Sequence, residues 1–149
     1  VKAVTHTMYT LFDSRATDPK IYPGTSGHSD VLNTGLDPEA LIDNGYKSVQ
    51  VTLQFDAKRL NAITLNNPSI EIYSNGELVA TLDFSENFGR TGFWGTTHWT
   101  EETATLSFPV DKLAADGEIT IVWKCDKVMG SGSDGYEIGD TTFTVDVTK

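Results

Sequence analysis

The strongest constraint on the fold is the regular alternation of apolar and polar residues in several short segments. In residues 48–55 the apolar face consists of Val49, Val51, Leu53 and Phe55. In residues 103–110 it consists of Ala104, Leu106, Phe108 and Val110, and in residues 118–125 of Ile119, Ile121, Trp123 and Cys125. A period of two places alternate side chains on one face of a β-strand. The pattern therefore predicts half-buried strands of antiparallel sheets, with Trp123 in the core.

Further strands are predicted at both ends of the chain and around an Asn-Gly pair. Residues 4–12 are rich in threonine and aromatic residues, and residues 136–148 place Phe143, Val145 and Val147 on one face. Residues 70–84 predict a hairpin around positions 75 and 76. A two-residue turn would pair Ile72 with Val79, whereas a three-residue loop with a bulge at Gly76 pairs Ile72 with Leu78. We favour the bulged form because it gathers the aliphatic side chains on one face.

Residues 13–44 contain many turn-forming residues and little regular pattern. Only residues 37–42 carry the residues that favour the start of a helix, with Asp37 as the N-cap and Pro38 at the first helical position. We expect a long surface excursion with one helical turn. Long loops are usually functional or disordered, so Tyr22 and His28 become candidates for the rim of a site.

These elements together predict an all-β fold. At least six short strands with almost no amphipathic helix indicate a single-domain antiparallel β-sandwich of jelly-roll type, with a barrel as the alternative. A chain of 149 residues suits one domain, over residues 1–149, with a sizeable core. No apolar run approaches the ~20 residues of a membrane helix, and no segment resembles a signal peptide. We expect a soluble excised domain or mature segment.

The charge of the chain excludes two classes of partner. Eleven basic and 21 acidic residues give a net charge of -10, which repels nucleic acid and anionic membrane surfaces. The acidity favours an extracellular, secreted domain. The single cysteine, Cys125, excludes an internal disulfide and a cysteine-based zinc site.

Residues 89–99 place two of the three tryptophans, Trp94 and Trp99, in a glycine-rich, polar segment. Large rings in such a segment bury little of their own surface, so they favour a partner with a flat apolar face, such as a sugar ring. Extending the alternation back from Ala104 puts Trp99 on the solvent side and His98 on the core side. The structural alternative is that one of these tryptophans closes the end of the sandwich.

Sugar recognition also requires planar polar groups that pair with hydroxyls. Gln50 and Gln54 lie on the polar face of residues 48–55, which is otherwise plain solvent surface. The predicted ligand-binding residues are Trp94, Trp99, His98, Arg90, Gln50, Gln54 and Tyr22.

The sequence predicts no catalysis and no cofactor. It contains no nucleophile-elbow motif, and the three histidines lie in unrelated contexts. Glu101 and Glu102 are adjacent on a strand and would point to opposite faces, unlike the paired carboxylates of a glycosidase. Asp134, Glu137 and Asp140 place oxygen ligands in a glycine-rich segment, as calcium sites do, but their spacing matches no EF-hand loop. We predict no metal, with structural calcium as the open alternative.

Several of these features resemble one family of proteins. They are the segment 108–121 (FPVDKLAADGEITI), the final strand 136–147, and the exposed Trp94 and Trp99. The chain resembles the β-sandwich carbohydrate-binding modules of plant-cell-wall-degrading enzymes, especially those of cellulosome type. The resemblance is one of pattern, because such modules share architecture and little common motif.

The resemblance implies a jelly roll that stacks a neutral β-linked polysaccharide, such as a β-glucan, xyloglucan or mannan, on tryptophans. It also implies a monomeric, non-catalytic module that targets an appended glycoside hydrolase to its substrate. If the sheet face of Trp123 were the binding surface, Trp123 would belong to the platform and not to the core. The alternative function is a structural or protein-interaction module, such as an adhesin, cohesin-like or spacer domain.

Overall fold

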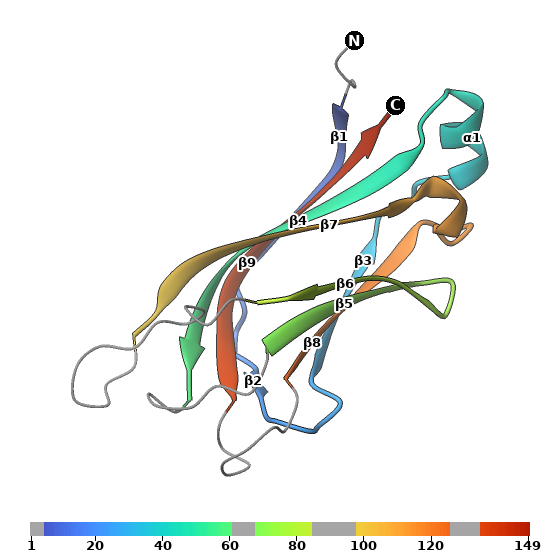
Figure 1. Ribbon diagram of the computed structural model, residues 1–149. Coiled ribbons are helices and arrows are strands. Elements are labelled where there is room, and N and C mark those ends of the chain that lie inside the picture. The colour runs from blue at the N-terminus through green and yellow to red at the C-terminus, as the bar shows by residue number, and fades with distance from the viewer. Residues whose placement is uncertain (1–4, 61–67, 85–97, 126–134) are drawn as a thin grey trace.

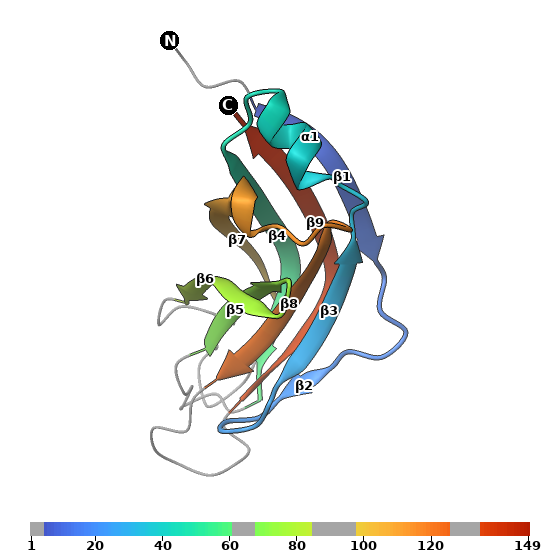
Figure 2. The ribbon, with the colours of Figure 1, turned by 90° about the vertical axis from the view of Figure 1, so that its right-hand side faces the viewer.

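The computed structural model describes residues 5–60, 68–84, 98–125 and 135–149, which form two antiparallel β-sheets stacked as layers (Figures 1 and 2). Sheet A contains, in order, β1 (Thr5–Asp13), β9 (Tyr136–Thr148), β4 (Ser48–Arg59) and β7 (Thr100–Pro109), and the short β2 (Lys20–Ile21) also pairs with β9. Sheet B contains, in order, β3 (His28–Asn33), β8 (Glu118–Cys125), β5 (Pro68–Ser74) and β6 (Glu77–Asp83).

With the two-residue β2 set aside, this strand order is that of an eight-stranded jelly roll. The prediction of an all-β, antiparallel sandwich of jelly-roll type is therefore confirmed. Among the described residues, two short helical pieces, α1 (Pro38–Asp43) and the 3₁₀ helix η2 (Val110–Lys112), lie in the connections. In the described part of the chain, no helix is long and apolar enough to cross a membrane.

The core lies between the facing sides of the two sheets. The inward residues predicted from the alternation are all buried, namely Val49, Val51, Leu53, Phe55, Ala104, Leu106, Phe108, Val110, Ile119, Ile121, Trp123, Cys125, Phe143, Val145 and Val147. Trp123 is 0% exposed, and its ring meets that of Phe55 edge to face at a centroid distance of 4.7 Å. Trp123 therefore belongs to the core and not to a binding platform.

Residues 13–44 are more regular than the sequence suggested. The helical turn is confirmed, since Asp37 caps α1 by accepting a hydrogen bond of 3.0 Å from the Glu39 N–H. The expectation of an otherwise irregular excursion is wrong, because β3 lies within it and forms an edge of sheet B. Leu32 is the one fully buried side chain of β3 and Val31 is 48% exposed, so an edge strand here shows no apolar alternation.

The hairpin of β5 and β6 also differs from the favoured form. Ser74 pairs with Glu77, and Asn75 and Gly76 have φ values of 56° and 71°, so the turn has two residues. The register shifts between Ile72 and Tyr73, which sets Ile72 opposite Ala80. The predicted pairing of Ile72 with Leu78 is therefore wrong. The bulge lies within β6, and it aligns the aliphatic residues that a plain two-residue turn would have separated.

Candidate ligand-binding groove

The outward face of sheet A carries rows of polar side chains that cross the strands. The register of β1, β9, β4 and β7 forms one such row from Phe12, Thr142, Gln54 and Thr103. At the next outward position of β4, two residues after Gln54, Asp56 lies opposite Glu101 of β7. The surface therefore has an aromatic ring at one side and amide, hydroxyl and carboxylate groups across its middle.

A groove follows this part of the sheet. Its larger part, of about 400 Å³, is lined by Phe12, Gln54, Phe55, Asp56, Glu101, Glu102, Thr103 and Asp140. A second hollow of about 210 Å³ is lined by Asp18, Asp56, Trp99, Gly139 and Asp140. Because Asp56 and Asp140 line both hollows, we treat them as one feature, the outer groove.

Trp99 forms the aromatic wall of the outer groove. Its ring lies close to Gly139 of β9, where an added Cβ atom would lie 3.3 Å from the ring atom Cζ3. Since β4 separates β7 from β9, the indole reaches across β4 from the start of β7. The Lys58 Nζ lies 5.1 Å from the ring centroid and 3.1 Å from Glu137 Oε1. Trp99 remains 43% exposed, which confirms that it lies on the solvent side of the sheet.

Five carboxylates of described residues line the groove, and four of them repel one another, namely Asp56 and its neighbours Asp18, Glu101 and Asp140. Burial raises the pKa of Asp56 above its ordinary value, and the negative charges of the other three raise it further. In the part of the chain that the structure describes, none of the four forms an ion pair. The groove is thus strongly negative.

The structure brings together only some of the residues predicted from the sequence. Trp99 and Gln54 line the outer groove, whereas Gln50 lies on the same face of β4 further along the strand, opposite Ser107. Tyr22 is 41% exposed but follows β2 and does not line the groove. Arg90 and Trp94 lie outside the described residues.

His98 corrects one prediction. The alternation of inward and outward side chains along residues 98–104 predicts His98 on the core side, but His98 is exposed. β7 begins at Thr100, so the strand pleat that fixes parity does not extend to position 98.

Sequence reasoning missed most of the polar lining. From the sequence, Phe12, Asp18 and Asp56 are assigned to no binding site, Asp140 is considered only as a possible calcium ligand, and Glu101 is considered only together with Glu102. Asp56 had a usable signal, since it is the next outward position after Gln54 and β4 continues to Arg59. Asp18 and Asp140 come from distant parts of the chain, and no local pattern connects them.

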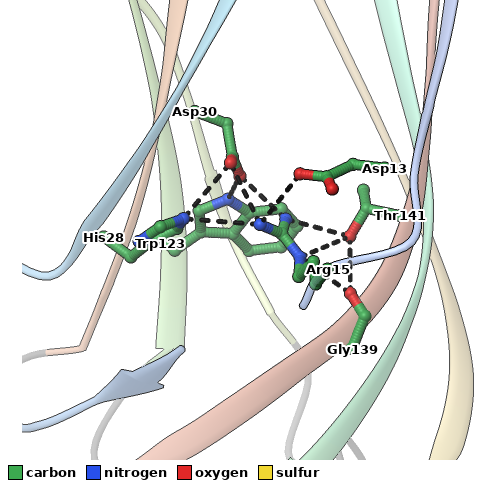
Figure 3. A network of polar contacts seen from close by, with 7 residues as sticks. All are labelled: Asp13, Arg15, His28, Asp30, Trp123, Gly139 and Thr141. Carbon is green, nitrogen blue, oxygen red and sulfur yellow. Dashed lines mark hydrogen bonds and ion pairs between the residues drawn. The ribbon is translucent and has the colours of Figure 1, made fainter. Parts of the chain in front are cut away.

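A second polar cluster, shown in Figure 3, lies between the two sheets and not on their surface. Arg15 donates two hydrogen bonds to the carboxylate of Asp30 on β3, at 3.0 and 2.8 Å, and one to the Gly139 carbonyl on β9, at 2.8 Å. The Trp123 Nε1–H donates to Asp30 at 2.8 Å. Thr141 accepts from Arg15 at 3.0 Å. Because each guanidinium nitrogen has a partner within the protein, we interpret the cluster as a structural link between the sheets.

Asp30 is the charged centre of this cluster. Burial raises its pKa, but hydrogen bonds and charge from Arg15, the Trp123 N–H and the charge of His28 outweigh burial and lower it below 3.8. The side chains of Arg15 and Asp30 are only 4% and 13% exposed. A buried pair with this many hydrogen bonds is stable as a unit and costly to break in half.

The sequence does not exclude a calcium site formed by Asp134, Glu137 and Asp140. Asp134 lies outside the described residues, Glu137 pairs with Lys58, and Asp140 lines the outer groove. Among the described residues, no group of three or more histidine, cysteine, aspartate or glutamate side chains is arranged to hold a metal ion.

Comparisons with known proteins do not assign the chain to a family. No protein-family model matches it, and no curated protein matches its sequence. Latent PorU from Porphyromonas gingivalis is similar over 97% of this chain and 12% of its own length, with 12% identity and a TM-score of 0.36. Tobacco streak virus coat protein is similar over 94% of this chain and 86% of its own, with 8% identity and a TM-score of 0.30. Likenesses this distant carry no information about the groove.

Proposed function

We propose that this domain is a non-catalytic carbohydrate-binding module whose ligand lies in the outer groove. The observation that carries the proposal is the exposed indole of Trp99 in the wall of a groove lined by hydrogen-bonding groups. A domain of this kind would hold an appended enzyme on a β-linked polysaccharide, as the family resemblance implies.

The chemistry of the groove suits a sugar chain. A pyranose ring has a face of C–H groups, which stacks on the electron-rich face of an aromatic ring. Trp99 and Phe12, which are 43% and 61% exposed, offer such rings in the two parts of the groove. Gln54 and Thr103 line the same part of the groove as Phe12 and supply both donors and acceptors for hydroxyl groups.

Trp99→Ala is expected to weaken polysaccharide binding by about five- to 150-fold. Stacking on an aromatic side chain is worth about 1 to 3 kcal/mol in nucleic-acid complexes, and we expect a similar range for a sugar ring. Affinity electrophoresis in gels that contain soluble polysaccharides measures the effect as a loss of retardation. The same incubations should release no reducing ends, since no catalysis is proposed.

Tyr22→Ala provides the matched control. Tyr22 is exposed to nearly the same extent as Trp99, at 41% and 43%, but lies outside the groove. It should therefore keep wild-type binding. Equal losses in both variants would place the ligand elsewhere, and no retardation of the folded wild type by any glycan would overturn the proposal.

One observation favours a protein-interaction module as the second candidate. β1 is an edge strand of sheet A, and Met8, Leu11 and Phe12 on it are 41%, 37% and 61% exposed. An exposed apolar edge strand is suited to pairing with a strand of another chain. Such binding would survive Trp99→Ala and be lost in Leu11→Lys. Co-sedimentation of each variant with a captured partner protein measures the difference.

A further inference from the structure

The charge of the outer groove constrains the ligand further than its aromatic rings do. Asp18, Asp56, Glu101 and Asp140 all line it. Lys58, a cation beside the groove, forms an ion pair with Glu137 at 3.1 Å. A neutral ligand would leave the mutual repulsion of the four carboxylates in place, and an anionic ligand would add to it.

The carboxylates alone would be a solvated patch. They coincide here with a groove of about 400 Å³, with a second hollow of about 210 Å³ beside it, and with two exposed rings. The Trp99 ring is in a cation–π contact with the Lys58 ammonium group, 5.1 Å from its centroid, which shows that the ring can face a positive charge. A ligand that matches both the rings and the carboxylates would present flat C–H faces and positive charges together.

We propose that the chain bound in the outer groove is a cationic oligosaccharide of β-linked amino sugars, of which glucosamine is the simplest unit. This inference rests on the carbohydrate-binding function proposed above, and it replaces the neutral chain expected from the sequence. Each glucosamine ring offers a C–H face to Trp99 and an ammonium group at its edge to the carboxylates. A lysine-rich peptide would satisfy the carboxylates but has no flat ring to stack on the indole.

Isothermal titration calorimetry of the intact domain with four hexamers tests this inference by measuring the dissociation constant of each. The titrations are made at about pH 5.5, where exposed carboxylates are ionised. The ligands are hexaglucosamine, its fully N-acetylated form, cellohexaose and hexalysine. The variants are Trp99→Ala, the double variant Asp56→Asn with Asp140→Asn, and a control double variant, Asp43→Asn with Asp111→Asn. The control makes the same change in net charge at exposed positions outside the groove. Thermal unfolding confirms that each variant is folded.

We expect hexaglucosamine to bind at least about tenfold more tightly than cellohexaose or the N-acetylated chain. Asp56→Asn with Asp140→Asn should weaken hexaglucosamine about five- to tenfold, and Trp99→Ala should weaken it further. The control variant should bind like the wild type, because a charge removed outside the groove is screened by salt.

Three results would count against this inference. Equal or tighter binding of cellohexaose, unchanged in the Asp56 and Asp140 variant, would overturn the cationic ligand and leave the carbohydrate function standing. Binding of hexalysine as tight as hexaglucosamine and insensitive to Trp99→Ala would make the groove a general cation surface. Failure to bind hexaglucosamine would overturn this inference, and the carbohydrate function would fall with it only if the folded wild type is also retarded by no glycan in affinity electrophoresis.

Discussion

Replacing Arg15 with methionine is expected to lower the free energy of unfolding by about 3 to 5 kcal/mol, the usual cost of removing one partner from a buried ion pair. Methionine keeps most of the apolar stem but leaves the Asp30 carboxylate, which is 13% exposed, without its bidentate partner. It also removes the donor to the Gly139 carbonyl and so one connection between β3 and β9. Urea unfolding followed by tryptophan fluorescence measures the change.

Lys112→Met is the matched control, since Lys112 and Glu77 form an ion pair in which the side chains are 49% and 60% exposed. Its loss should cost no more than about 1 kcal/mol. The pKa of Asp30 is lowered in the folded state, so its contribution to stability is present above pH 3.8 and is lost as pH falls through the lower folded value. The difference between wild type and Arg15→Met should therefore shrink in acid. Equal costs for the Arg15 and Lys112 variants would contradict a structural role for the cluster.

Trp123→Ala is expected to cost about 3 to 5 kcal/mol, as the removal of a fully buried large aromatic ring usually does. The indole is 0% exposed, contacts the Phe55 ring, and donates to Asp30. Trp123→Phe keeps a six-membered ring against Phe55 but removes the N–H donor together with the rest of the indole's five-membered ring. A hydrogen bond to a charged group is worth about 1.5 to 3 kcal/mol, and the lost ring atoms leave a cavity, so the phenylalanine variant should cost at least about 1.5 kcal/mol and less than Trp123→Ala.

Combining Trp123→Phe with Arg15→Met tests whether the two side chains act through the same carboxylate. Both donate to the Oδ2 atom of Asp30, at 2.8 Å in each case. Residues that share a partner usually couple by about 0.5 to 3 kcal/mol. Additive losses in urea unfolding would show that the Trp123 N–H and Arg15 stabilise the fold independently.

The sequence predicted those strands that bury one face and expose the other without a break in the alternation. β4, β7, β8 and β9 each bury every second side chain along most of their length, which gives a clear period of two. β3 was not predicted, because it is an edge strand with one fully buried residue and so lacks a clear period of two. The β5–β6 register was misassigned because a bulge at Val79 cannot be seen in a pattern that only counts residues from the turn.

The groove was predicted only in part for a different reason. Trp99 and Gln54 stand out locally, one by its glycine-rich context and the other by strand parity. The carboxylates of Asp18 and Asp140 join them only because β9 lies beside β4 and the segment before β2 lies beside both. The Arg15 cluster has the same origin, since its residues come from β1, β3, β8 and β9 regions that are far apart in the chain. Proximity created by topology leaves no local pattern.

The strand order also determines when the domain can complete its folding. β9 lies between β1 and β4, with Thr5 opposite Thr148 and Val49 opposite Val147, so the centre of sheet A is made by the last strand of the chain. Until residues 136–148 leave the ribosome, β1 lacks its neighbour, and Met8 and Leu11 face water on an unpaired strand. Sheets dominated by such distant pairings fold in about milliseconds to seconds. The nascent domain therefore passes through an interval in which its N-terminal strand is open to wrong partners.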